Sequence, residues 1–153
     1  MTEPRPRAPI VQERLLPASP QEVFDAWSDP EGLAVWMCPA PDMKRATVEL
    51  DFRVGGSFRI AMHGAEQDYL HRGEYLEIEP PNRLVMTWES LWQPEGQTRT
   101  RVEVTFESAG AGQTRIVLVH DELPDTGIYD GHEQGWQTIL AKLDQHLQTE
   151  DRR

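Results

Sequence analysis

The hydrophobic residues near the end of the chain recur at helical spacing. Residues 130–147 read DGHEQGWQTILAKLDQHL, and their apolar side chains fall on one stripe: Trp136, Ile139, Leu140, Leu143 and Leu147. This spacing predicts an amphipathic helix roughly 25 Å long. An apolar stripe of that length must be covered by another part of the fold.

Most of the chain before this helix alternates between apolar and polar residues, which is typical of half-buried strands. Strands are expected at 10–16, 46–52, 57–62, 71–79, 84–89, 101–107 and 115–121. Turn residues separate them at Gly55-Gly56, at Pro80-Pro81-Asn82, at 93–97 and at 110–112, and the polar stretch 64–70 is expected to be a loop. The first strand is a candidate edge strand.

Two helix starts lie between the first and second predicted strands. Ser19 can cap a helix that has Pro20 at its first position and Glu22 at the place that a capping box requires. Asp29-Pro30-Glu31 begins a second short helix. Two short helices, six or seven mostly hairpin-linked strands and one long final helix predict an α+β fold, with a curved sheet around the last helix.

The phase of the last strand predicts where His120 points. Arg115 and Asp121 share one face with Val117 and Val119, and the charged ends identify that face as the outer one. His120 is therefore expected to face the interior, on the side opposite Asp121.

Charge and composition exclude several classes of partner. The net charge is −11, so nucleic acid and anionic membranes would be repelled. Cys38 is the only cysteine, which rules out an internal disulfide and favours a reducing cytoplasm. The first nine residues lack the apolar core of a signal peptide, and no apolar run is long enough to span a bilayer. We expect a flexible arm at 1–9, one domain at 10–148 and a tail at 149–153, as a cytoplasmic monomer or homodimer.

Five segments, in this order, resemble a known family. They are PQEVFDAWSDPEGLAVW (20–36), DFRVGGSFRI (51–60), GEYLEIEPPNRLVMTW (73–88), TRIVLVHDEL (114–123) and HEQGWQTILAKLDQHL (132–147). They are similar to the bacterial branch of the activator-of-heat-shock-protein-90-ATPase-like family, within the START-like, birch-pollen-allergen-like (SRPBCC) superfamily. The resemblance covers residues 10–147 and implies the helix-grip fold, in agreement with the pattern above.

The resemblance also implies a range of functions. Members of the superfamily hold hydrophobic ligands between the sheet and the long helix, and they include lipid carriers, polyketide cyclases and antibiotic-binding proteins. The co-chaperones of the family carry a separate N-terminal chaperone-binding domain, for which this sequence has no room. Chaperone activation is therefore not carried over to this chain.

A sheet curved around a helix encloses an interior that can hold a small molecule. For any single candidate, a plain core position is the more common role, and as a set they favour a cavity only because the fold does. The candidates for ligand binding are Trp36, Phe58, Ile60, Met62, Tyr75, Met86, Trp88, Val104, Leu118, His120, His132, Trp136 and Leu140.

Three of these candidates carry polar groups. His120, His132 and Tyr75 can hydrogen-bond a ligand or transfer a proton, although a buried histidine more often satisfies a backbone group. Gly135 in the last helix suggests a close approach of another segment.

Cofactors, metals and nucleophilic catalysis are not expected. The five histidines, at 63, 71, 120, 132 and 146, form no HxxxH or HExxH pair, and Cys38 has no partner cysteine and no base nearby in sequence. Gly55-Gly56 lacks the lysine and helix of a phosphate loop.

Three functions stay open at this point. The first is non-enzymatic binding of a small apolar or aromatic molecule, which predicts a cavity of a few hundred Å³ in order of magnitude. The second is a cyclase- or hydratase-type enzyme that uses His120 or Tyr75 as acid or base, which needs two titratable groups facing one substrate. The third is an interaction protein for a chaperone or another partner, which predicts a filled interior and an exposed apolar patch.

Overall fold

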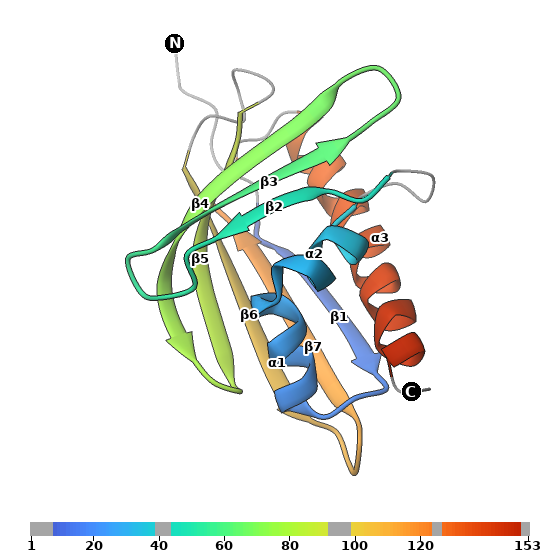
Figure 1. Ribbon diagram of the computed structural model, residues 1–153. Coiled ribbons are helices and arrows are strands. Elements are labelled where there is room, and N and C mark those ends of the chain that lie inside the picture. Colours follow the sequence, from blue (N-terminus) through green and yellow to red (C-terminus); the bar gives the residue numbers. More distant parts are fainter. Residues whose placement is uncertain (1–7, 39–43, 92–98, 124–126, 151–153) are drawn as a thin grey trace.

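The chain forms one seven-stranded antiparallel sheet with three helices, seen in the computed structural model (Figure 1). The structure describes residues 8–38, 44–91, 99–123 and 127–150. The strands are β1 (Ile10–Leu16), β2 (Thr47–Leu50), β3 (Ser57–His63), β4 (Asp68–Glu79), β5 (Arg83–Ser90), β6 (Thr100–Ser108) and β7 (Thr114–Asp121). The helices are α1 (Pro20–Ser28), α2 (Pro30–Trp36) and α3 (Gly127–Glu150).

The sheet is a meander whose last strand pairs with the first. Its order is β1-β7-β6-β5-β4-β3-β2, so β1 and β2 are the edges. Every pair is antiparallel, including β1 with β7, where Ile10 lies opposite His120. This confirms the predicted fold class and the edge position of the first strand.

The two short helices begin where their sequence signals lie. Ser19 accepts a hydrogen bond from the Glu22 backbone, and the Glu22 side chain accepts one from the Ser19 backbone, which completes the capping box. Asp29 caps α2 by accepting from the Glu31 backbone. Since Asp29 ends α1 and begins α2, the chain changes direction there within one residue.

The concave face of the sheet carries the core. The predicted stripe of α3 is buried along its length: Trp136, Ile139, Leu140, Leu143 and Leu147. Helix α1 packs on the same face of the sheet, because Phe24 and Trp27 both meet Phe106 of β6 edge to face. Figure 1 shows the sheet bending around these helices.

Several predicted boundaries and one predicted burial pattern differ from the structure. Strand β4 begins at Asp68, inside the stretch expected to be a loop, because His63 pairs with Asp68 and only 64–67 remain for the turn. Helix α3 extends about one turn at the N-terminal end and three residues at the other, so it includes part of the expected tail. In β5 the outward-facing Val85 and Thr87 are buried as well, so this strand departs from the alternation of a half-buried strand.

Some expectations fall on parts of the chain outside the described residues. These are most of the N-terminal arm (1–7) and the whole turn at 93–97, together with the proline-containing loop that the sequence predicts at 39–41. The assignment of 10–148 as the domain stays a prediction.

Candidate functional site

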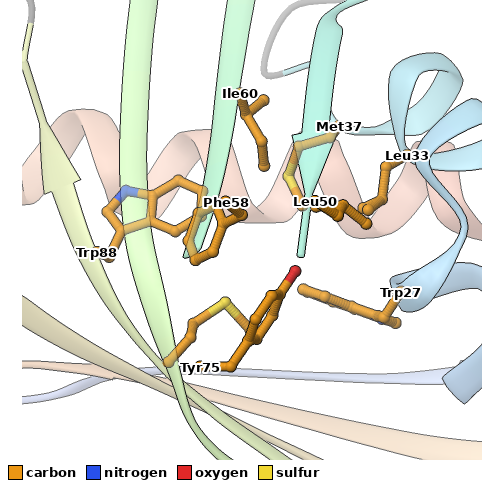
Figure 2. A pocket seen from close by; sticks show the side chains of 9 residues that line it. Trp27, Leu33, Met37, Leu50, Phe58, Ile60, Tyr75 and Trp88 are labelled. Atoms are coloured by element: carbon orange, nitrogen blue, oxygen red, sulfur yellow. The ribbon is translucent and has the colours of Figure 1, made fainter. Parts of the chain in front are cut away.

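A small pocket lies between the sheet and the two short helices (Figure 2). It has a volume of about 10 Å³. Its wall is drawn from α1, α2, the residue after α2 and strands β2 to β5: Trp27, Leu33, Met37, Leu50, Phe58, Ile60, Tyr75, Met86 and Trp88. All nine side chains are apolar or aromatic, so an apolar molecule is the chemistry that this wall accommodates.

Strand alternation and one glycine bring these side chains together. Phe58 and Ile60 face inward from β3 because they are two residues apart. Gly73 lies opposite Phe58 in β4, and a Cβ atom there would come within 2.4 Å of the Phe58 ring and 2.1 Å of the Thr87 carbonyl oxygen. The absence of a side chain at residue 73 therefore lets the Phe58 ring approach the backbone of β4 closely.

Tyr75 is the polar member of the wall. It is 3% exposed and packs against the rings of Phe52 and Phe58, at centroid distances of 5.0 and 5.4 Å. Burial raises the pKa of its hydroxyl well above the ordinary value, so Tyr75 stays protonated. The hydroxyl makes no hydrogen bond with the described residues, and it is not among their fully enclosed unpaired polar atoms, so a water molecule can reach it.

Two buried indole groups near the pocket also lack acceptors. The rings of Trp27 and Trp36 meet edge to face at 4.9 Å. Among the described residues, neither Nε1 has a hydrogen-bond partner. Buried donors without acceptors are uncommon in folded proteins, so this end of the core has an unusual surplus of donors.

Next to the pocket, across Trp88, is a histidine cluster made of His71, His120 and His132 with Trp88 and Trp136. The ring of His120 lies 5.1 Å from that of His132, and the ring of His71 lies 6.1 Å from that of His132. The Trp88 ring packs at a tilt against the rings of His71 and Trp136, at centroid distances of 5.0 and 5.1 Å. The cluster thus joins β4, β5, β7 and α3.

The hydrogen bonds of His120 determine its tautomer. The Trp136 indole donates to Nδ1 at 3.0 Å, so Nδ1 carries no proton. The Thr100 hydroxyl donates to the Trp88 carbonyl at 2.6 Å, so it accepts from Nε2–H of His120 at 2.7 Å. Burial, then the neighbouring His132 and His71, lower the pKa of His120. His120 is therefore a neutral group with both nitrogens satisfied, and it is not available as an acid or base.

The other two histidines differ from His120. Nε2 of His132 accepts from the Trp88 indole at 3.2 Å and lies 3.1 Å from the Ser90 hydroxyl. His71 is 5% exposed, and its Nδ1 has no hydrogen-bond partner among the described residues. Burial first and His132 second lower the pKa of His71 to about 3, and the Tyr69 backbone opposes the shift. His71 is thus neutral near pH 7.

A separate hydrogen-bonded chain runs across the outer face of β2, β3 and β4. Thr47 Oγ1 lies 2.8 Å from Nε2 of His63, whose Nδ1 lies 2.8 Å from the Asp68 carboxylate. The order of groups is that of a nucleophile, a base and an orienting acid. His63 and Asp68 are direct cross-strand partners of β3 and β4 on the outer surface, so we interpret these contacts as cross-strand pairing rather than a catalytic site.

The structure divides the predicted site residues into three groups. Those on the pocket wall are Phe58, Ile60, Tyr75, Met86 and Trp88. Those in the core away from that wall are Trp36, Met62, Val104, Leu118 and Leu140. Those in the histidine cluster, besides Trp88, are His120, His132 and Trp136. A ligand-binding role for any of them stays a prediction.

Sequence reasoning missed four residues of the wall: Trp27, Leu33, Met37 and Leu50. Trp27 and Leu33 fall on the apolar sides of the early helices, a pattern that indicates burial but not a place on this wall. Their position beside Tyr75 depends on how α1 and α2 pack on the sheet. The hydrophobic periodicity within each helix does not predict that packing.

Metal and thiol chemistry find no support in the described residues. No group of three or more histidine, cysteine, aspartate or glutamate side chains in them is arranged to hold a metal ion. The thiol of Cys38 is buried and donates to the Lys44 carbonyl at 3.3 Å. Burial raises the pKa of this thiol against the opposing charge of Lys142, which disfavours the nucleophilic thiolate. None of the described helices is long and apolar enough to cross a membrane.

The fold matches several solved structures. A protein from Rhizobium leguminosarum is 26% identical, with a TM-score of 0.76 over 97% of this chain and 99% of the other. Protein CV1439 from Chromobacterium violaceum is 25% identical, with a TM-score of 0.76 over 90% and 96%. An HSP90 activator from Plasmodium falciparum is 22% identical, with a TM-score of 0.73 over 90% and 94%, a likeness of fold alone.

A comparison with curated proteins found no match. The comparison with family models found one that covers residues 17–148, which is most of the chain and includes both short helices and α3. The chain therefore belongs to the family described as Activator of Hsp90 ATPase homolog 1-like protein.

Proposed function

We propose that this protein binds a small apolar or aromatic molecule in the pocket between the sheet and the helices. The observation that supports this most is the wall itself, where nine apolar or aromatic side chains from six elements converge. Such a wall gains free energy by excluding water, and it sits within the core rather than on an exposed edge.

The size of the pocket sets a condition on binding. A cavity of about 10 Å³ has space for about one water molecule, far below the few hundred Å³ expected of a preformed site. A ligand must therefore select a more open arrangement of the wall. Met37 and Met86 are suited to this, because unbranched thioether side chains change rotamer easily.

Catalysis has less support than binding. An acid–base enzyme of the cyclase or hydratase type needs two titratable groups within reach of one substrate. Tyr75 is the titratable side chain on this wall, and His120 is already hydrogen-bonded at both nitrogens. We therefore assign the pocket to binding.

Methionine-methyl NMR tests the proposal. The protein contains buried methionines both on and off the pocket wall, so the methionine off the wall serves as an internal control. Met37 and Met86 line the pocket, whereas Met62 is equally buried but lies off the wall. Titration with small aromatic compounds should shift the methyl signals of Met37 and Met86 and leave that of Met62 nearly unchanged.

Native mass spectrometry of freshly purified protein complements the titration by identifying any molecule that co-purifies. If no small aromatic compound moves the Met37 and Met86 signals, or if Met62 moves alone, the pocket is not a binding site.

A further inference from the structure

The wall of the pocket offers hydrogen-bond donors without acceptors. The Tyr75 hydroxyl makes no hydrogen bond with the described residues and is almost fully buried. Figure 2 shows its oxygen directed into the space beside Trp27 and Leu50. Trp27 lines the same pocket, and its buried Nε1 also lacks an acceptor within the described structure.

The rest of the wall cannot satisfy these donors. Leucine, isoleucine and phenylalanine side chains have no acceptor atoms, and thioether sulfurs are weak acceptors. The Trp88 indole is also a donor, and it is engaged by His132. A water in this space could accept from these donors, but it would find no acceptor for its own hydrogens other than the Tyr75 oxygen. A ligand oxygen that carries no hydrogen can take the place of such a water without leaving a donor unpaired.

The composition of the wall also restricts which group of a ligand can accept a hydrogen bond from these donors. It contains no lysine, arginine or histidine, so a carboxylate or phosphate would be buried without a counter-charge. A ligand with its own N–H group would bring a further donor to a wall that lacks acceptors. The chemistry left is a neutral oxygen acceptor on a compact apolar body.

Resting on the binding function proposed above, we propose that the ligand is a neutral aromatic carbonyl compound, such as an aryl ketone, aldehyde or quinone, whose oxygen accepts a hydrogen bond from Tyr75. Tyr75 is then the residue that determines specificity. The aromatic body of the ligand lies against Phe58 and Trp88, whose rings are 5.8 Å apart on the wall.

A matched pair of probes tests this: acetophenone and α-methylstyrene. They differ by replacement of the carbonyl oxygen with a methylene group, so shape and apolar area are nearly the same. Dissociation constants come from the methyl shifts of Met37 and Met86. We expect acetophenone to bind roughly tenfold more tightly to the wild-type protein, which is the typical effect of one net hydrogen bond.

Two variants test whether the Tyr75 hydroxyl causes the preference for acetophenone over α-methylstyrene. Tyr75→Phe removes only the hydroxyl, and it should abolish the preference by weakening acetophenone while leaving α-methylstyrene unchanged. Tyr129→Phe is the control, because Tyr129 is also buried but donates to the Ala8 carbonyl at 3.0 Å, away from the wall. This variant should keep the full preference.

The outcomes separate the two proposals. Equal affinities for the two probes, or a preference that survives in Tyr75→Phe, would overturn the inference while leaving apolar binding intact. Failure of both probes to move the Met37 and Met86 signals would overturn the binding function and the inference together. Thermal unfolding of both variants verifies that they are folded.

Discussion

Single residues in the histidine cluster show how burial selects one protonation state. His120 was expected to face inward from the phase of its strand, and it is fully buried. Its partners Thr100 and Trp136 come from β6 and α3, so strand phase gave no information about them. Together they hold one neutral tautomer of His120. This favours a structural role for His120 in the core over a role as an acid or base.

His71 makes the fold sensitive to acid. Its pKa is about 3 in the folded protein, below the ordinary value of 6.5, so the unfolded chain takes up a proton first as the pH falls. The stability that neutral His71 provides is complete above pH 6.5 and is lost as the pH falls from 6.5 towards 3. The loss approaches about 1.4 kcal/mol per pH unit for one proton.

Urea unfolding between pH 7 and pH 4 measures this loss. His71→Gln cannot titrate, so its free energy of unfolding should fall less steeply with acid than that of the wild type. The slopes of the free energy of unfolding against pH should differ between the two proteins by an amount that corresponds to the uptake of up to one proton on unfolding. Parallel curves for the two proteins would contradict the assignment of acid sensitivity to His71.

At the scale of elements, α3 is the helix that closes the interior. Trp136 is 1% exposed, packs against Trp88 and donates to His120. Trp136→Ala should lower the free energy of unfolding by about 3–5 kcal/mol, because it leaves a cavity and an unpaired His120 nitrogen. Denaturant unfolding measures this change.

The neighbouring Gln137 is exposed and provides the matched control. Gln137→Ala should change stability by less than about 0.5 kcal/mol, as is usual for an exposed position. A change below about 1 kcal/mol for Trp136→Ala would mean that Trp136 contributes little to the packing of α3 on the sheet.

For the whole molecule, the sequence was sufficient for the fold but not for the pocket. Alternation, two helix caps and one apolar stripe are local signals, and they predicted the seven strands, the short helices and the inward face of α3. The pocket depends on how those elements meet. Trp27 and Leu33 reach it only because α1 packs against β6 and α2 against β2, and its small volume depends on side-chain packing that no local pattern specifies.

The pairing of β1 with β7 has a consequence for how the protein is made. Every other strand pair joins neighbours in sequence, so β2 to β7 can assemble stepwise as they leave the ribosome. The first strand has no partner until Thr114–Asp121 has been synthesised. For most of translation this segment therefore stays unpaired, and its Ile10 and Leu16, which are buried in the finished fold, have no completed core to enter.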